Sequence, residues 1–193
     1  MKRALLVIDV QNVYFGDRMR VTHPADSLDN ILAAMDAAAR HGVPIVVIQH
    51  TSPKGGSFGR GVPAWELHPD VAARHYDKLI EKNRPGSFTG TDLEAWLRDN
   101  GIDTVTIAGY MTQMCCDTTA RQASHLGFAV EFLSDATGTL AFTNAGGSAT
   151  AEELHRATLV AQAYAFSKVM TTAAWIGALT PERPVPPESS PAA

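Results

Sequence analysis

Six short apolar segments, most of them rich in β-branched residues, recur along the chain, and longer stretches of helical character separate them. Continuous apolar runs such as IVVI and TVTIAG are typical of strands that are buried on both faces. Strands that alternate with helices predict one parallel sheet covered by helices on both sides, which is an α/β fold. The expected strands are residues 4–8, 44–49, 78–81, 104–108, 129–133 and 168–171. The third run has the weakest apolar pattern, so this strand is expected at an edge of the sheet.

Helix signals lie between these strands. The apolar spacing predicts one helix over residues 27–40 and another over residues 114–126. Two pairs have the spacing of a capping box, in which each side chain accepts the other residue's backbone N–H. These pairs are Thr91 with Glu94 and Thr150 with Glu153, the second opening a helix to about residue 165.

Length and composition fit one domain. The chain has 193 residues, of which 45% are apolar, enough to fill one substantial core. We expect this domain over residues 1–180, followed by a proline-rich tail over residues 181–193 that is expected to be disordered. Residues 51–69 form a glycine- and proline-bearing insertion, whose length is typical of an active-site or interface loop.

Charge and hydropathy exclude several classes of partner. The net charge of −4 is spread along the chain without a run of Lys or Arg, so we expect no nucleic-acid partner. No stretch approaches the roughly 18 apolar residues of a membrane helix, so we expect no membrane contact. The first residues lack the features of a signal peptide, which makes a cytoplasmic location the expectation.

Three reactive side chains from distant parts of the chain are expected at one edge of the sheet. Asp9 follows the first strand, Lys82 follows the third, and Cys115 begins the helix after the fourth. In a doubly wound sheet, ligands bind outside the carboxyl ends of the strands. The N–H groups at a helix start favour a thiolate, a nearby carboxylate supplies a base, and an ammonium stabilises both charges. Cys115 is therefore the candidate nucleophile.

The segment GYMTQMCCDTTARQA, at residues 109–123, resembles the nucleophile segment of the isochorismatase-like cysteine hydrolases. LLVIDVQNVYF and EKNRPGSFTGTDLEAWLRDNGIDTVTIAG resemble two further motifs of that superfamily, in the same order, and the resemblance spans about residues 3–175. It implies a three-layer α/β/α sandwich around a six-stranded parallel sheet with the Rossmann-like order 3-2-1-4-5-6.

The resemblance also implies a catalytic triad. Asp9 would take the thiol proton, Cys115 would attack a carbonyl carbon, and Lys82 would support both. The superfamily places a non-proline cis peptide before the nucleophile, here between Tyr110 and Met111, and an oxyanion hole made by the backbone N–H groups of Met111 and Cys115. The neighbouring Cys116 falls on a position that is usually apolar, so we expect it to be a buried structural residue.

Two branches of the superfamily fit less well. Nicotinamidases bind a metal through an Asp-x-His pair and a second His, whereas this chain has Gln49, His50 and His68 without that pattern. We therefore expect neither a metal nor a cofactor. Isochorismatases proper cleave a vinyl ether and lack the nucleophilic cysteine, so Cys115 argues against that reaction. The resemblance is to the metal-free amidohydrolase-type members.

The expected function is cysteine-dependent hydrolysis of a small-molecule C–N bond in an amide, lactam or ureido compound, through a thioester acyl-enzyme. The alternatives are cleavage of another bond by the same fold, or a catalytically idle oligomeric binding protein. A small-molecule substrate and a homodimer or homotetramer are expected. Candidate substrate contacts, chosen because they lie near the expected crevice, are Gln11, Phe15, Trp65, Gln113 and Phe142.

Overall fold

A six-stranded parallel sheet forms the centre of the computed structural model, which describes residues 1–179; the tail expected at 181–193 lies outside these residues. Its strand order, β3-β2-β1-β4-β5-β8, confirms the predicted order, since β8 is the sixth strand of the sheet. The strands are β1 (Arg3–Ile8), β2 (Ile45–His50), β3 (Lys78–Lys82), β4 (Thr104–Tyr110), β5 (Ala129–Gly138) and β8 (Lys168–Met170).

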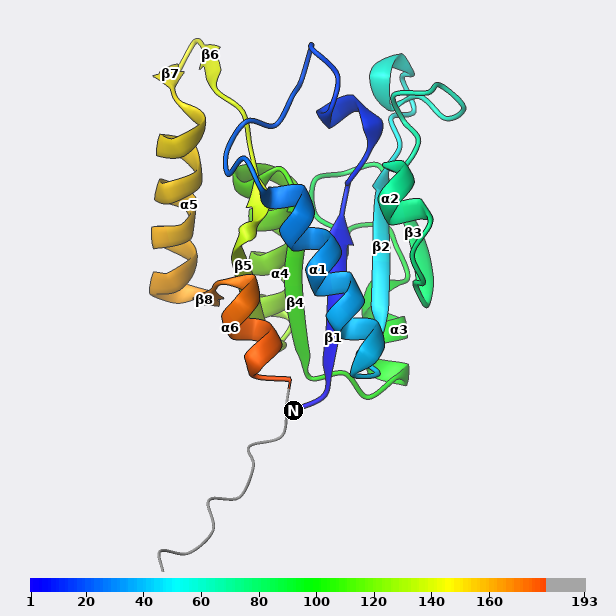
Figure 1. Cartoon of the computed structure of the whole chain (residues 1–193). Helices are drawn as coiled ribbons and strands as arrows, with labels where there is room; N and C mark the ends of the chain where they lie inside the picture. Colours follow the sequence, from blue (N-terminus) through cyan, green and yellow to red (C-terminus); the bar gives the residue numbers. More distant parts are fainter. Residues whose placement is uncertain (180–193) are drawn as a thin grey trace, which may run out of the picture.

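Helices cover both faces of the sheet, as Figure 1 shows. Helices α1 (Ser27–Arg40) and α6 (Thr172–Gly177) lie in front in that view, and α3 (Leu93–Asp99) and α4 (Asp117–His125) lie behind. Helix α5 (Ala151–Ala165) packs on α4 and β8 at one side. The three-layer sandwich is therefore confirmed. No helix within residues 1–179 combines the length and the apolar character that crossing a membrane requires.

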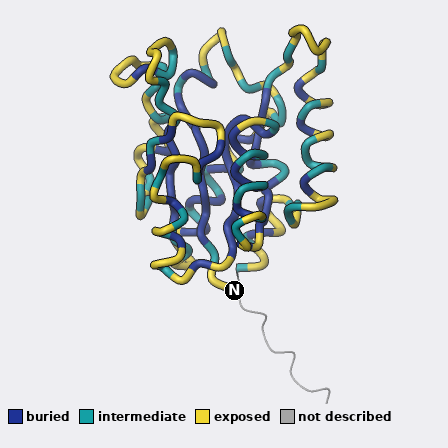
Figure 2. The backbone as a smooth tube through the Cα atoms, turned by 180° about the vertical axis from the view of Figure 1, so that it is seen from behind, coloured by how far each residue is buried: buried dark blue, intermediate teal, exposed yellow. Residues whose placement is uncertain are grey.

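The central strand β1 shows how the sequence builds two cores. Leu5 and Val7 face one apolar cluster, whereas Leu6 and Ile8 face the other, as the two-residue period of a strand requires. All four are fully buried, and burial of each side chain stabilises the folded state by roughly 1.5–3 kcal/mol. Figure 2 shows the sheet as the buried centre of the molecule and the loops around it as the exposed part.

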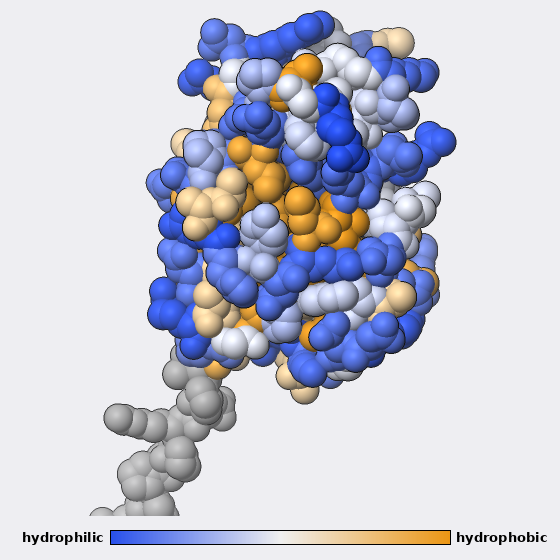
Figure 3. Space-filling view, turned by 90° about the vertical axis from the view of Figure 1, so that its right-hand side faces the viewer, coloured by the Kyte–Doolittle hydropathy of each residue, from blue (hydrophilic) through white to orange (hydrophobic). Residues whose placement is uncertain are grey.

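Strand β3 is one edge of the sheet, as its weak apolar pattern predicted. Figure 3 looks onto the side of the molecule that carries β3 and shows a mainly hydrophilic surface with a hydrophobic area near its middle. Leu79 of this strand is 42% exposed, and the strand also carries Lys78 and Glu81. Charged side chains on an edge strand discourage pairing with another chain.

Gly109, near the end of β4, lets that strand approach β1 closely. It pairs with Ile8, has a φ of 116°, and a Cβ at this position would lie 2.1 Å from the carbonyl oxygen of Ile8. Only glycine fits such a backbone and such an approach. The chain after β4, which carries Cys115, is thereby brought beside Asp9 at the end of β1.

One of the two predicted capping boxes forms. Thr150 and Glu153 accept each other's backbone N–H at the start of α5. The predicted box at Thr91 and Glu94 is wrong, because the Thr91 hydroxyl donates to the carbonyl oxygen of Ser87 at 2.6 Å. A local hydrogen bond of this kind competes with helix capping.

Several elements around the carboxyl ends of the strands were not expected. Strand β5 runs five residues further than predicted, to Gly138, and is followed by a small hairpin. The helix expected to start at residue 114 begins earlier, with a π-helical turn. The added elements are the hairpin strands β6 (Phe142–Asn144) and β7 (Gly147–Ala149), the short helix α2 (Pro69–Ala72), the 3-10 turns Asn12–Tyr14 and Gly56–Phe58, and the π-helical turn Thr112–Cys116.

Candidate active site

A buried ion pair lies where β1 and β3 end. Lys82 Nζ donates to Asp9 Oδ2 at 2.6 Å, and neither side chain is exposed. Burial lowers the pKa of Lys82, but the negative charges of Asp9 and of an ionised Cys115 raise it more, so the net shift is upward and the amine stays protonated. The other carboxylate oxygen, Asp9 Oδ1, is buried without a hydrogen-bond partner within residues 1–179.

The backbone at Asp9 is unusual for a residue with a side chain. Its φ is 53°, in the left-handed region, and its carbonyl oxygen accepts the N–H of Gln11 at 2.8 Å. Such conformations are uncommon outside glycine and cluster at functional sites. The turn makes the chain leave β1 sharply and holds the Asp9 carboxylate over the end of the sheet.

His50, the last residue of β2, completes this buried group. Its Nδ1 lies 3.3 Å from Lys82 Nζ. Burial lowers the pKa of His50 and the charge of Lys82 lowers it further, so the imidazole is neutral at neutral pH. Because an ammonium can only donate, Nδ1 is the acceptor and the ring proton is on Nε2.

Cys115 lies within the π-helical turn and is 8% exposed. Burial raises the pKa of its thiol, the charge of Asp9 raises it further, and Lys82 lowers it by less. The expectation of a resting thiolate is therefore corrected: the group is a neutral thiol beside a carboxylate. The helical backbone begins at Thr112, so Cys115, its fourth residue, lies within the first turn as expected.

Cys116 points elsewhere. It is fully buried in the apolar cluster between the sheet and helices α3 and α4. Burial raises the pKa of its thiol well above the usual value. One residue of helix turns a side chain by about 100°, so only one of two adjacent cysteines faces the site.

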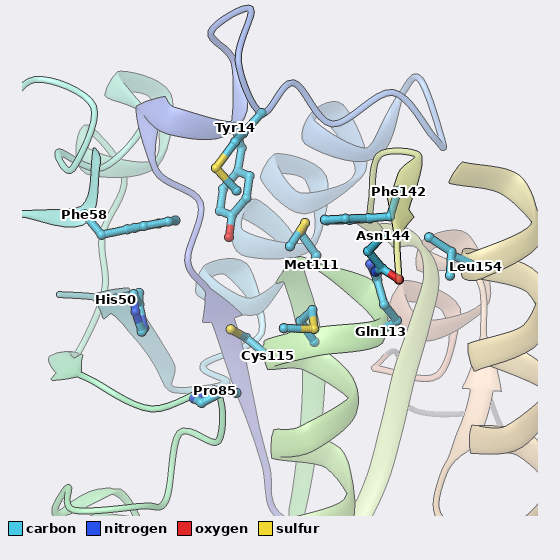
Figure 4. A pocket seen from close by; sticks show the side chains of 12 residues that line it. Tyr14, His50, Phe58, Pro85, Met111, Gln113, Cys115, Phe142, Asn144 and Leu154 are labelled. Carbon is cyan, nitrogen blue, oxygen red and sulfur yellow. The ribbon is translucent and has the colours of Figure 1, made fainter. Parts of the chain in front are cut away.

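A cavity of about 530 Å³ opens above Cys115, and Figure 4 shows the Cys115 sulfur directed into it. Of the predicted substrate contacts, Gln113 and Phe142 line this cavity. Gln113 comes from the same π-helical turn as Cys115. Phe142 and Asn144 are two residues apart on β6, so both face the cavity, as strand periodicity requires.

Three other predicted contacts, Gln11, Phe15 and Trp65, are not among the lining residues of this cavity. The Gln11 amide donates to the carbonyl oxygens of His50 and Trp65 and accepts the His50 N–H. Trp65 Nε1 donates to Thr51. Gln11 and Trp65 therefore fasten the 51–69 insertion to the strand ends.

Phe15 has a similar supporting position. Its ring packs on His68, with centroids 4.3 Å apart, and on Tyr110. His68 Nδ1 accepts the backbone N–H of Asp70 at 3.3 Å and so caps α2. These contacts hold the loop after β1 against the insertion behind the cavity wall.

Tyr14 and Phe58 line the cavity but were missed from the sequence. Their rings meet edge to face, with centroids 5.9 Å apart. Burial and the charges of Asp9 and Cys115 raise the pKa of Tyr14 well above the usual value, so its hydroxyl stays protonated. Figure 4 shows this hydroxyl pointing into the cavity. The only sequence signal was their place in the two loops that follow β1 and β2.

The peptide bond between Tyr110 and Met111 is cis, at the position where the family resemblance implied one. Met111 directly follows β4 and lines the cavity. The carbonyl oxygen of Met111 accepts the N–H groups of Met114 and Cys116, which fixes the turn that carries Cys115.

The residues near the cavity do not fit a metal site. Residues 1–179 contain no group of three or more His, Cys, Asp or Glu side chains that could hold an ion. His50 Nδ1 faces the Lys82 ammonium, and a fixed positive charge at 3.3 Å opposes binding of a cation there. His68 Nδ1 is engaged at the start of α2.

The absence of a metal requirement stays a prediction with a simple test. Because the candidate site offers a carboxylate that is already paired with an ammonium, we expect EDTA treatment to leave hydrolysis unchanged. Activity is measured before and after dialysis against EDTA. Complete loss of activity, restored by zinc or iron, would contradict this expectation.

The fold and the site together define a doubly wound α/β protein with a cysteine over a buried carboxylate–ammonium pair, at the point where the strand order reverses. The isochorismatase domain model matches residues 3–174. The chain belongs to the isochorismatase family, as its motifs predicted, and members of this family are hydrolases.

Known relatives agree with this assignment. The crystal structure of a candidate isochorismatase from Burkholderia xenovorans LB400 shares 47% sequence identity and a TM-score of 0.90, over 92% of this chain and 87% of that one. Nicotinamidase 3 of Arabidopsis thaliana is 34% identical over 178 residues, 85% of this chain and 82% of the relative. Streptothricin hydrolase of Streptomyces noursei is 31% identical over 134 residues, 69% of this chain and 49% of the relative.

Proposed function

We propose that the protein is a cysteine-dependent hydrolase of a C–N bond in a small amide, lactam or ureido compound, acting through a thioester acyl-enzyme. The observation that carries this proposal is the position of Cys115, which lines a cavity next to the buried Asp9–Lys82 ion pair. Similarity to a nicotinamidase and to streptothricin hydrolase supports the class of bond.

Acylation begins with a neutral thiol and a carboxylate. As the Cys115 sulfur attacks the carbonyl carbon, its proton passes to Asp9, whose Oδ1 has no other hydrogen-bond partner within residues 1–179. Proton transfer by a positioned group typically contributes about 10²–10⁴-fold to the rate. Asp9 then returns this proton to the leaving nitrogen, the C–N bond breaks, and a thioester and a free amine result.

Deacylation repeats these roles with water. Asp9, again ionised, takes a proton from the attacking water, the C–S bond breaks, and the proton passes from Asp9 to the departing sulfur. The products are a carboxylic acid and the restored Cys115 thiol. Lys82 stays protonated throughout because the net shift of its pKa is upward. Its charge stabilises the thiolate as it forms and leaves, and its hydrogen bond holds Asp9 in place.

The negative oxygen of each tetrahedral intermediate also requires donors. We assign this role to the backbone N–H groups of Met111 and Cys115, which belong to the turn that lines the cavity. One such donor typically contributes about 3–4 kcal/mol to transition-state stabilisation. Backbone donors cannot be removed by changing a side chain, so substitutions test the nucleophile Cys115 and the base Asp9 and not these donors.

A screen of small C–N compounds tests the proposal. We expect ammonia or amine release from at least one primary amide or ureido compound, or ring opening of at least one lactam, measured with a coupled ammonia assay or by mass spectrometry of the product. The matched control is the Cys115→Ala variant, which should release none above background. Release of product from vinyl ethers but from no C–N compound would overturn the proposed bond.

A further inference from the structure

The cavity walls are almost entirely uncharged. Of the 12 side chains that line it, none is Asp, Glu, Lys or Arg. The titratable members are Tyr14, His50 and Cys115, and each is neutral at neutral pH. Burial and nearby charges raise the pKa of Tyr14 and of Cys115, and burial and Lys82 lower the pKa of His50. The apolar members are Met19, Phe58, Met111, Met114, Phe142 and Leu154, with Pro85 at the edge.

Lys82, the cation of the buried ion pair beside Cys115, is not free to bind an anionic substrate. Lys82 is fully buried and already pairs with Asp9 at 2.6 Å. A carboxylate that entered this cavity would lose its hydration without gaining an ionic partner from the walls, which is strongly unfavourable. The cavity therefore discriminates against substrates that carry a carboxylate, whereas an apolar body gains from contact with the thioether and aromatic walls.

One lining residue has an unsatisfied polar atom. Gln113 Oε1 is buried and has no hydrogen-bond partner within residues 1–179. A buried acceptor without a partner is unfavourable, so a ligand that donates to it binds more tightly than one that does not. Figure 4 shows Gln113 on the opposite side of the cavity from His50, beside the hairpin strand that carries Phe142 and Asn144.

We propose that the site selects uncharged amides with an apolar body, and that Gln113 is a specificity-determining residue that accepts a hydrogen bond from the substrate end remote from the scissile bond. This inference rests on the proposed function and names its substrate class. The reacting carbonyl lies over Cys115, the body lies along the methionine and phenylalanine side chains, and the remote end reaches Gln113.

Three amides of matched length test the selectivity: hexanamide, 6-hydroxyhexanamide and adipamic acid, which end in a methyl, a hydroxyl and a carboxylate. We expect kcat/KM for both neutral amides to exceed that for adipamic acid by about 100-fold or more, because a buried carboxylate without a partner is strongly unfavourable. Equal or faster hydrolysis of adipamic acid would overturn the inference and leave the proposed function intact.

A variant that adds a positive charge to the cavity wall is expected to shift the preference toward the carboxylate substrate. Leu154, on α5, lines the cavity, and Leu154→Arg should raise kcat/KM for adipamic acid about tenfold or more while lowering it for hexanamide. Val160→Arg, on the same helix but 67% exposed and outside the cavity, is the matched control and should leave the ratio unchanged. No shift in the ratio for Leu154→Arg would contradict the proposed position of the remote end.

The role of Gln113 is tested separately. Gln113→Leu should lower kcat/KM for 6-hydroxyhexanamide about 3- to 10-fold more than for hexanamide, through KM, because only the hydroxyl donates to Oε1. Gln113→Glu keeps an acceptor and should keep most of the preference for the hydroxyl. Equal losses on both substrates in Gln113→Leu would contradict the assigned hydrogen bond.

Binding measurements test the selectivity even if none of the amides is turned over. If none of the three amides is hydrolysed, the proposed function fails for this substrate class. Calorimetric titration of the Cys115→Ala variant with the same compounds then decides selectivity alone. Tighter binding of the neutral amides supports the inference, and equal or tighter binding of adipamic acid overturns it.

Discussion

Replacement of Cys115 by alanine is expected to lower kcat/KM for a hydrolysed amide by at least about 10⁴-fold, because removal of a covalent nucleophile disables the whole catalytic group. The fold should be retained, since the change removes only one sulfur atom at a cavity wall. Amine release at high enzyme concentration measures the residual rate, and circular dichroism checks the fold. Activity near that of the wild type would contradict a covalent role for Cys115.

Cys116→Ala is the matched control for this variant. Cys116 is fully buried in the cluster under α3 and α4, so its truncation should lower the free energy of unfolding by about 1 kcal/mol, as for loss of one methylene-sized group. The rate of hydrolysis should change little. If Cys116→Ala instead abolished turnover in a folded protein, the assignment of the two cysteines would be reversed.

Asp9→Asn is expected to lower kcat/KM by about 10²–10⁴-fold, because an amide cannot carry the proton between sulfur, leaving nitrogen and water. The Asn side-chain oxygen can still accept from Lys82 Nζ, so the fold should be retained. Steady-state kinetics measures this loss. Asp36→Asn, at a partly exposed ion pair with Arg74, is the matched control and should leave the kinetics unchanged.

The same variant should alkylate more readily although it hydrolyses more slowly. The charge of Asp9 raises the pKa of Cys115 and the charge of Lys82 lowers it, so removing the Asp9 charge lowers this pKa. The pH at which iodoacetamide labels Cys115 at half its maximal rate should therefore fall in Asp9→Asn. A rise in that pH would show that Asp9 does not oppose ionisation of the thiol, and the electrostatic description of the site would be wrong.

The layout of the sheet could be predicted because each strand carries its own signal. A continuous apolar run such as Leu5 to Ile8 has no polar face to present to solvent, so it is expected in the interior, where it is found. The order of the strands was implied by the family resemblance. The hairpin β6–β7 and the extension of β5 could not be predicted, because these segments are short and consist largely of polar residues, alanine and glycine. Their positions depend on tertiary contacts such as the pairing of Gly138 with Tyr110.

The candidate site was predictable in part, for a similar reason. Asp9, Lys82 and Cys115 stand at strand ends, which topology alone brings to one edge. Which loop side chains turn inward depends on packing, so Gln11 was misplaced and Tyr14 was missed. The protonation of Cys115 depends on its burial, which no local pattern reports.

The expected homodimer or homotetramer stays a prediction. Helix α5 gives it a physical basis, because Val160 and Tyr164 are 67% and 92% exposed. The alanines of this helix do not form a core-facing stripe, since Ala157, Ala163 and Ala165 are exposed as well. A single apolar side chain on a surface is ordinary, but a row of them on one helix is less so.

Product partitioning tests most directly whether Cys115 carries the acyl group. A hydrolysed amide and an ester with the same acyl group are each turned over in the presence of hydroxylamine, and the ratio of hydroxamate to acid is measured. A common thioester on Cys115 predicts the same ratio from both substrates, because the leaving group has departed before the nucleophiles compete. Ratios that differ with the leaving group would contradict an acyl-enzyme on the route to product.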